Sequence, residues 1–181
     1  MAQLFPSPSA DFDHPIDMLD GCHGRIRQNC ERIEKIAAHV ASVGVDAAAR
    51  DAAHAVVRFF DTAGATHHRD EEEDLFPVLL VCAPRDERAA ARALIDELRA
   101  DHLRMDHAWR DMRRSLLLLA AVGNDGLTAE RAREFRALYE RHIAREESQM
   151  LPLARRVLEP AMAKSLGVRM AARRGVKRRA A

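Results

Sequence analysis

The sequence predicts an all-α protein folded as an antiparallel, up-down four-helix bundle, and three observations support this prediction. Leu, Ala, Arg and Glu dominate the 181 residues, and these residues favour helix over strand. Glycine is sparse, with 8 residues, and no stretch rich in Val, Ile or Thr alternates in the manner of a strand. Apolar residues recur at helical spacing in four long segments, separated by glycines, prolines and capping residues.

The first two segments are divided by a short connection after Gly44. Pro15 suits the first turn of the first helix, whose apolar stripe continues up to this glycine. Asp46 can cap the second segment, which runs to Leu80. Pro77 lies near the end of that segment, so we expect a kink or a break there.

The third segment begins in the sequence APRDE, residues 83–87, and includes the apolar run Leu116–Leu119. The loop GNDGLT follows, after which Thr128 can cap the fourth segment and Pro160 can stop it. Segments of roughly 30 residues are about 45 Å long, and short connections make successive helices antiparallel. These lengths and connections are typical of an up-down bundle.

One domain is expected over residues 14–160, followed by a basic C-terminal tail over residues 161–181. Although the net charge is only +1, seven basic residues and no acidic residue follow Glu159. Because no aromatic residues are interleaved with these bases, nucleic acid is not expected as a partner. A solvated or partly helical terminus is the simpler interpretation of the tail.

The cysteine content, the N-terminal sequence and the length of the apolar runs favour a soluble, cytoplasmic protein. Three cysteines, an odd number without a CxxC pair, argue against a disulfide framework and against a zinc–cysteine site. The N-terminus lacks the basic start and apolar run of a signal peptide. The longest apolar run, SLLLLAAVG from Ser115, is too short to cross a membrane.

The segment HHRDEEEDLFP, residues 67–77, is repeated as HIAREESQMLP, residues 142–152. In each copy a histidine lies ten residues before a proline and a glutamate lies six residues before it. These pairs are His67 with Glu71 and His142 with Glu146. Because residues four apart share one face of a helix, each copy directs an imidazole and a carboxylate the same way.

The other two segments each contribute one histidine on an apolar stripe. His23 follows Leu19 by four residues, and His102 follows Leu98 by four residues. The bundle can therefore gather these side chains at one level of its interior, where they would be costly unless paired or bound to a metal. We predict a metal site formed by His23, His67, Glu71, His102, His142 and Glu146.

The donor atoms restrict the metal only in part. Imidazole and carboxylate together suit borderline divalent ions, and iron, manganese and zinc stay open. A carboxylate has two oxygens and can bridge two ions, so two glutamates flanked by pairs of histidines describe a dinuclear centre. The other charged residues of the first copy are expected to form a mostly solvated face: Arg69, Asp70, Glu73 and Asp74.

These motifs resemble those of the hemerythrin-like (HHE cation-binding) domains. The matching pieces are CHGRIR, HHRDEEEDLFP, ADHLRMDHAW and HIAREESQMLP, and the likeness covers residues 14–160. The resemblance implies two non-haem iron ions, bridged by oxo or hydroxo groups and by the two glutamates, with the six predicted residues as ligands. It also implies a small ligand such as dioxygen or nitric oxide, and a redox partner protein, in sensing, redox chemistry or iron handling under stress.

The third segment departs from the oxygen-carrying members of that family, which have a second histidine one turn after the first. Here that position is Asp106, and His107 falls off the face. Asp106 is therefore a candidate extra ligand, and so is His68, which with Glu72 repeats the motif in a rival register that the proline alignment disfavours. The departure favours sensing or iron handling over reversible oxygen carriage.

Two other functions stay open at this point. One is a di-iron enzyme that reduces peroxide or dioxygen, or oxidises ferrous iron. Ferritin-type sites use E-x-x-H pairs, whereas Arg99 and Tyr139 lie three residues before His102 and His142. The other is a structural interaction bundle that binds no metal. We expect a metal- and ligand-binding protein rather than an enzyme.

Overall fold

The computed structural model describes residues 12–123 and 126–176, and every regular element within them is a helix. The predicted all-helical class is therefore confirmed. The first rod is α1 (Pro15–Val43) and the third is α5 (Arg88–Val122). The second rod joins α2 (Ala47–Phe59), the π-helical segment η1 (Phe60–Gly64), α3 (Ala65–Arg69), the π-helical segment η2 (Asp70–Leu75) and α4 (Phe76–Cys82). The fourth rod joins α6 (Ala129–Arg145), the π-helical segment η3 (Glu146–Met150) and α7 (Leu151–Val157), and α8 (Pro160–Arg173) follows.

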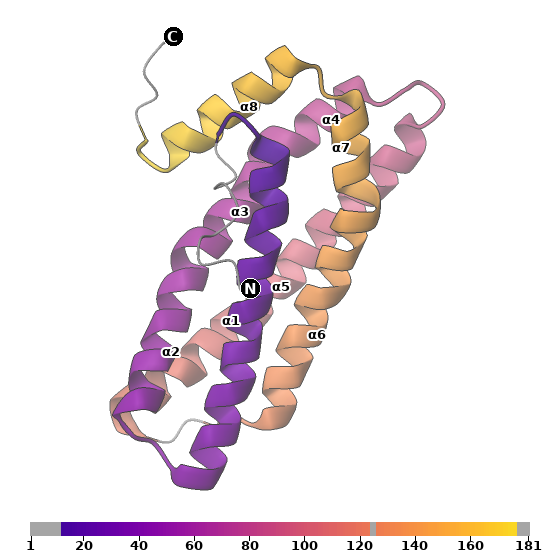
Figure 1. The fold of residues 1–181 in the computed structure, drawn as a ribbon. Coiled ribbons are helices and arrows are strands. Elements are labelled where there is room, and N and C mark those ends of the chain that lie inside the picture. Colours follow the sequence, from indigo (N-terminus) through magenta and orange to yellow (C-terminus); the bar gives the residue numbers. More distant parts are fainter. Residues whose placement is uncertain (1–11, 124–125, 177–181) are drawn as a thin grey trace, which may run out of the picture.

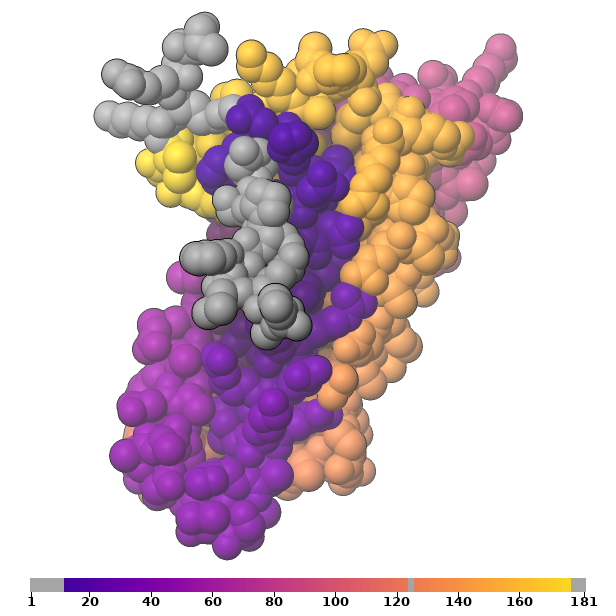
Figure 2. All heavy atoms as spheres, viewed as in Figure 1, coloured from indigo at the N-terminus to yellow at the C-terminus, as the bar shows by residue number. Residues whose placement is uncertain are grey.

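The four rods lie side by side, and α8 lies across one end of them (Figure 1). α1 packs against α2 and α6, and α5 packs against the same two helices, so the rods enclose one interior. α8 contacts α1 and η2. Figure 2 shows α8, in yellow, over the end where α1 begins, in dark indigo. Among the described helices, none is long and apolar enough to cross a membrane.

The predicted capping residues act as helix boundaries. The Asp46 side chain accepts a hydrogen bond from the backbone N–H of Ala49 at 2.8 Å, and Thr128 accepts one from Arg131 at 3.2 Å. Gly44 ends α1 with a φ of 91°, a conformation that costs little only in glycine. The boundaries of the first, second and fourth rods were therefore predictable from these residues.

The prolines within the two motif copies do not end their rods. Pro77 and Pro152 each lie in the first turn of the helix that follows a π-helical segment. A π-helical turn contains an extra residue and changes the hydrogen-bonding register, so the missing N–H of proline is accommodated without a break. Pro160 lies beyond the end of the fourth rod and begins α8.

A layer of polar residues divides the buried core into two apolar clusters. On α1, Leu19 belongs to one cluster and Ile26 to the other, with His23 between them. On α5, Leu98 and Met105 are divided in the same way, with His102 between them. The apolar clusters therefore enclose the level at which the sequence predicts the metal site.

Two acids of the first motif copy are buried, so the predicted solvated face is wrong for them. Asp70 is 0% exposed and Asp74 is 4% exposed. Only Arg69 and Glu73 behave as expected, since both are exposed and paired with each other. Buried carboxylates need partners, and theirs come from a distant part of the chain.

These partners belong to α8 and to Arg174 directly after it, in the basic segment predicted as a tail. Arg169 Nε donates to Asp74 at 2.6 Å, and Arg174 Nη2 donates to Asp70 at 2.6 Å. Arg173 pairs with both acids. α8 is thus joined to the second rod by charge as well as by packing. Three further bases of the segment lie outside the described residues: Lys177, Arg178 and Arg179.

Candidate metal centre

The structure brings the six predicted ligands together in the polar layer, and each is 4% exposed or less. All four rods contribute, with single histidines from the first and third rods and a histidine–glutamate pair from each of the others. The donors are His23 on α1, His67 on α3, Glu71 in η2, His102 on α5, His142 on α6 and Glu146 in η3.

Both motif pairs make the contact that their spacing predicts. His67 Nε2 lies 3.4 Å from Glu71 Oε1, and His142 Nε2 lies 3.0 Å from Glu146 Oε1. In each copy the histidine belongs to the α-helix and the glutamate to the π-helical segment that follows it. π-Helical turns occur frequently at functional sites, because the extra residue redirects side chains.

Each glutamate also reaches a histidine on another rod with its second oxygen. Glu71 Oε2 lies 3.5 Å from His102 Nε2, and Glu146 Oε2 lies 3.0 Å from His23 Nε2. One oxygen of each carboxylate therefore adjoins the histidine of its own motif, while the other adjoins a histidine from a different rod. This is the disposition that a carboxylate needs to bridge two ions.

The donors form two overlapping groups, which we name position A and position B. Position A has His23 and His67, position B has His102 and His142, and both positions share the two glutamates. Within each group the ligand atoms lie within 4.8 Å of one another. At position B, the two Nε2 atoms are 3.2 Å apart. Nitrogens bound at right angles to one ion, each about 2.1 Å from it, are about 3 Å apart, so this spacing suits a shared metal.

Several of these buried donor atoms have no hydrogen-bond partner among the described residues. They include both nitrogens of His67 and both oxygens of Glu71 and of Glu146. Folded proteins rarely leave buried polar atoms unsatisfied. Unsatisfied nitrogens and oxygens that converge on one space fit a bound cation, which would interact with all of them at once.

The electrostatics of the metal-free layer also suit a cation. Burial lowers the pKa of His67 to about 3, so its imidazole is neutral and free to act as a ligand. Burial and the neighbouring Glu146 raise the pKa of Glu71 well above its usual value. Burial also acts to raise the pKa of Glu146, but His142, His23 and His67 together outweigh it and hold that pKa well below its usual value. The two carboxylates are thus shifted in opposite directions, and a cation between them would favour the charged form of both.

A second carboxylate in each motif copy orients a histidine on another rod. Glu72 Oε1 lies 2.6 Å from His102 Nδ1, and Glu147 Oε1 lies 3.3 Å from His23 Nδ1. An Nδ1–H that donates to a carboxylate leaves Nε2 unprotonated and directed at the centre. Neither orienting contact was predicted from the sequence, where Glu72 was considered only with His68. Their signal is the Glu-Glu pair that ends H-x-x-x-E-E in both copies.

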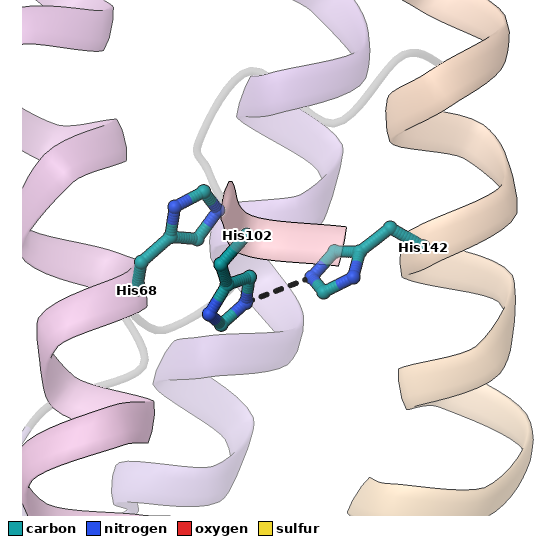
Figure 3. A group of neighbouring side chains, drawn as sticks. All are labelled: His68, His102 and His142. Carbon is teal, nitrogen blue, oxygen red and sulfur yellow. Dashed lines mark hydrogen bonds between the residues drawn. The ribbon is translucent and has the colours of Figure 1, made fainter. Parts of the chain in front are cut away.

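His68 lies against position B, although the sequence places it only in a rival register (Figure 3). Its ring stacks on that of His102 with the centroids 4.1 Å apart. Ligand nitrogens of His68, His102 and His142 lie within 4.8 Å of one another. Asp106, the other candidate extra ligand, belongs to none of the clusters of ligand atoms in the described chain, and it is exposed and paired with Arg110.

A pocket of about 300 Å³ opens beside position B. Its lining includes His68 and His102 from the centre, together with Glu72 and Asp106. The pocket provides an approach from the surface to the histidine side of position B.

Comparison with known proteins gives the same family as the motifs. The sequence model of the hemerythrin HHE cation-binding domain matches residues 14–154, a range that includes all six predicted ligands. A relative from Haemophilus influenzae, described as an uncharacterized protein, is 29% identical over 177 residues. The alignment covers 98% of this chain and 99% of the relative.

Proposed function

This chain belongs to the family of hemerythrin HHE cation-binding domains, and from its centre we propose a non-haem di-iron protein that binds dioxygen or nitric oxide. Sensing, redox chemistry or iron handling under stress, in the cytoplasm and with a redox partner protein, would use such a centre. We also take the four rods to be the antiparallel, up-down bundle of this family. The proposed ligands are His23 and His67 at position A, His102 and His142 at position B, and Glu71 and Glu146 between them.

The observation that carries this proposal is the placement of the glutamate oxygens. A single ion would need only one oxygen from each carboxylate. Here the two oxygens of Glu71 adjoin His67 and His102, and those of Glu146 adjoin His142 and His23. Donors divided in this way supply two adjacent positions with two histidines each, which supports a dinuclear centre over a mononuclear one.

A pair of ferrous ions would supply the capacity to bind a diatomic ligand and to change oxidation state. The chain's own residues prepare the site for this. Burial keeps His67 neutral, and Glu72 and Glu147 orient the histidines of the third and first rods. The apolar clusters on either side exclude bulk water. The pocket beside His68 and His102 provides room for a molecule as small as dioxygen to approach.

The test is anaerobic reconstitution of the metal-free protein with ferrous iron. Iron per chain is counted after removal of unbound metal, and optical spectra are recorded before and after exposure to nitric oxide or air. We expect two irons per chain and a new visible absorption band with either ligand. A band that reverses on deoxygenation would indicate oxygen carriage, whereas irreversible oxidation would favour sensing or redox roles.

Two variants make the result specific to this centre. His67→Ala removes a proposed ligand, and His107→Ala removes an exposed histidine of α5. We expect the first variant to lose iron and the spectral change, and the second to retain both. Fewer than one iron per chain in the unmodified protein, with no difference from His67→Ala, would leave a structural helical bundle as the better interpretation.

A further inference from the structure

His68 differs in character from its counterpart in the other motif copy. The fourth rod has Ile143 in the equivalent place, and that side chain is 1% exposed and belongs to an apolar cluster. Packing alone would therefore favour an apolar residue at position 68. Instead the chain places an imidazole there, at the boundary between the metal centre and the pocket.

The contacts of His68 are those of a ligand without its ion. Among the described residues it has no hydrogen bond and no ion pair, and its neighbours are other rings. It lies face to face with His102, at an interplanar angle of 16°, and its centroid is 5.9 Å from that of His142. His68 is half-buried, and a cation shared with His102 and His142 would give its ring a polar partner that the described residues do not supply.

We propose that His68 is a fifth histidine ligand of the centre and binds the ion at position B together with His102 and His142. This inference rests on the proposed function, because it assumes that the centre binds metal. The two metal positions would then differ in their histidine ligands, with two at position A and three at position B. Glu71 and Glu146 would be shared between them.

To bind the ion at position B, the His68 ring nitrogen has to move only a short distance towards those of His102 and His142. The ligand nitrogens of these three histidines lie within 4.8 Å of one another, whereas nitrogens bound at right angles to one ion are about 3 Å apart. A rotation of the half-buried His68 side chain, which lines the pocket, would bring its ring nitrogen closer to those of His102 and His142. His68 also becomes the ligand between position B and solvent.

The test uses cobalt(II), whose visible spectrum reports the number and type of its ligands. Metal-free full-length protein is titrated anaerobically against a chelator of known affinity, so that the two binding steps are resolved. We compare the unmodified protein with His68→Phe, which retains a ring of similar size, and with His107→Ala as the matched control. We expect His68→Phe to weaken one step by about 100-fold or more, since even outer-shell partners contribute about 10- to 100-fold. The visible bands of that ion should change as well.

Chemical rescue separates ligation from packing. His68→Gly leaves a space that adjoins the pocket, so free imidazole can reach position B from solvent. We expect imidazole to restore the cobalt spectrum and the weakened step in this variant, and to have no effect on His107→Ala. A residue that only fills space would not be replaced by dissolved imidazole.

The outcomes distinguish this inference from the proposed function. If the unmodified protein binds two cobalt ions, and both steps and the spectrum of His68→Phe agree with it within twofold, His68 is not a ligand while the dinuclear centre stands. If the unmodified protein binds no cobalt, the proposed function itself fails. A weakened step that imidazole restores would support both.

Discussion

The two motif copies share some features and differ in others, and the difference separates what forms the metal centre from what surrounds it. Both copies place a histidine on an α-helix and a glutamate in the following π-helical segment, with a proline in the next helical turn. Both also place a second glutamate against the Nδ1 of a histidine on another rod. The shared residues are therefore those that face the polar layer.

The differences lie at positions outside the shared set of histidines and glutamates. The second rod has His68, Asp70 and Asp74 where the fourth rod has Ile143, Arg145 and Gln149. The two aspartates bind the arginines of α8, and His68 adjoins the pocket. The H-x-x-x-E-E frame thus supplies the shared side chains of the polar layer, while residues within and just after the frame make the contacts with α8 and the pocket.

The largest expected effect tests whether Glu71 and Glu146, the two glutamates proposed to bridge the ions, are equivalent. Glu71→Ala and Glu146→Ala should each weaken metal binding by more than about 100-fold, because each variant removes one donor from both positions. Metal counting after reconstitution measures this. Glu73→Ala, which alters an exposed glutamate of the same stretch, should retain the metal. Two firmly bound ions in either bridging variant would contradict the shared role.

The next effect tests the pairing of a buried aspartate with arginines at the C-terminal end of α8, which the fourth rod lacks. The double variant Arg173→Ala/Arg174→Ala removes partners of Asp70, which is 0% exposed. Leaving a buried carboxylate without its partner costs about 3–5 kcal/mol, so we expect a loss of that size in the free energy of unfolding in urea. Arg155→Ala, which removes an arginine paired with exposed acids, should change it by less than about 1 kcal/mol. If the double variant lost no more unfolding free energy than Arg155→Ala, the docking of α8 would not depend on the ion pairs of Asp70.

A smaller effect compares the two orienting glutamates. Glu72→Ala and Glu147→Ala should weaken cobalt(II) or iron(II) binding by about 10- to 100-fold in chelator competition. Glu72 should have the larger effect, since it lies 2.6 Å from His102 Nδ1, whereas Glu147 lies 3.3 Å from its histidine and binds Arg27 more closely, at 2.7 Å. Glutamine at either position still accepts a hydrogen bond and should restore part of the affinity. A larger loss of affinity in Glu147→Ala than in Glu72→Ala would mean that Glu147, held by Arg27, orients the His23 imidazole more firmly than Glu72 orients that of His102.

The smallest effect is a pH dependence that we assign to His67. Its pKa is lowered by burial to about 3, while the ordinary value in an unfolded chain is about 6.5. The unfolded chain takes up the proton first, so this contribution to stability is complete above pH 6.5 and is lost progressively as the pH falls from 6.5 towards 3. Between pH 7 and pH 5.5 the loss for the metal-free protein is about 1 kcal/mol by urea unfolding. In His67→Phe this part of the pH dependence should disappear; its persistence would assign it to other groups.

Much of the fold and the composition of the site were predictable because both follow from local spacing. Apolar periodicity identifies the rods, and Asp46, Thr128 and Gly44 mark their ends. The i, i+4 relation selects His67 with Glu71, and His142 with Glu146. These features depend only on the geometry of a single helix.

What required the tertiary structure depends on how the rods are rotated and aligned against one another. The pairing of each glutamate oxygen with a particular histidine, the placement of Glu72 beside His102, and the position of His68 at the pocket all cross between rods. π-Helical turns shift the facing of the residues that follow them, and helical periodicity does not reveal such a shift. The burial of Asp70 depends on arginines more than a hundred residues later in the chain. Local sequence therefore specified which histidines and glutamates can meet in the polar layer, and the packing of the rods and α8 determined their partners.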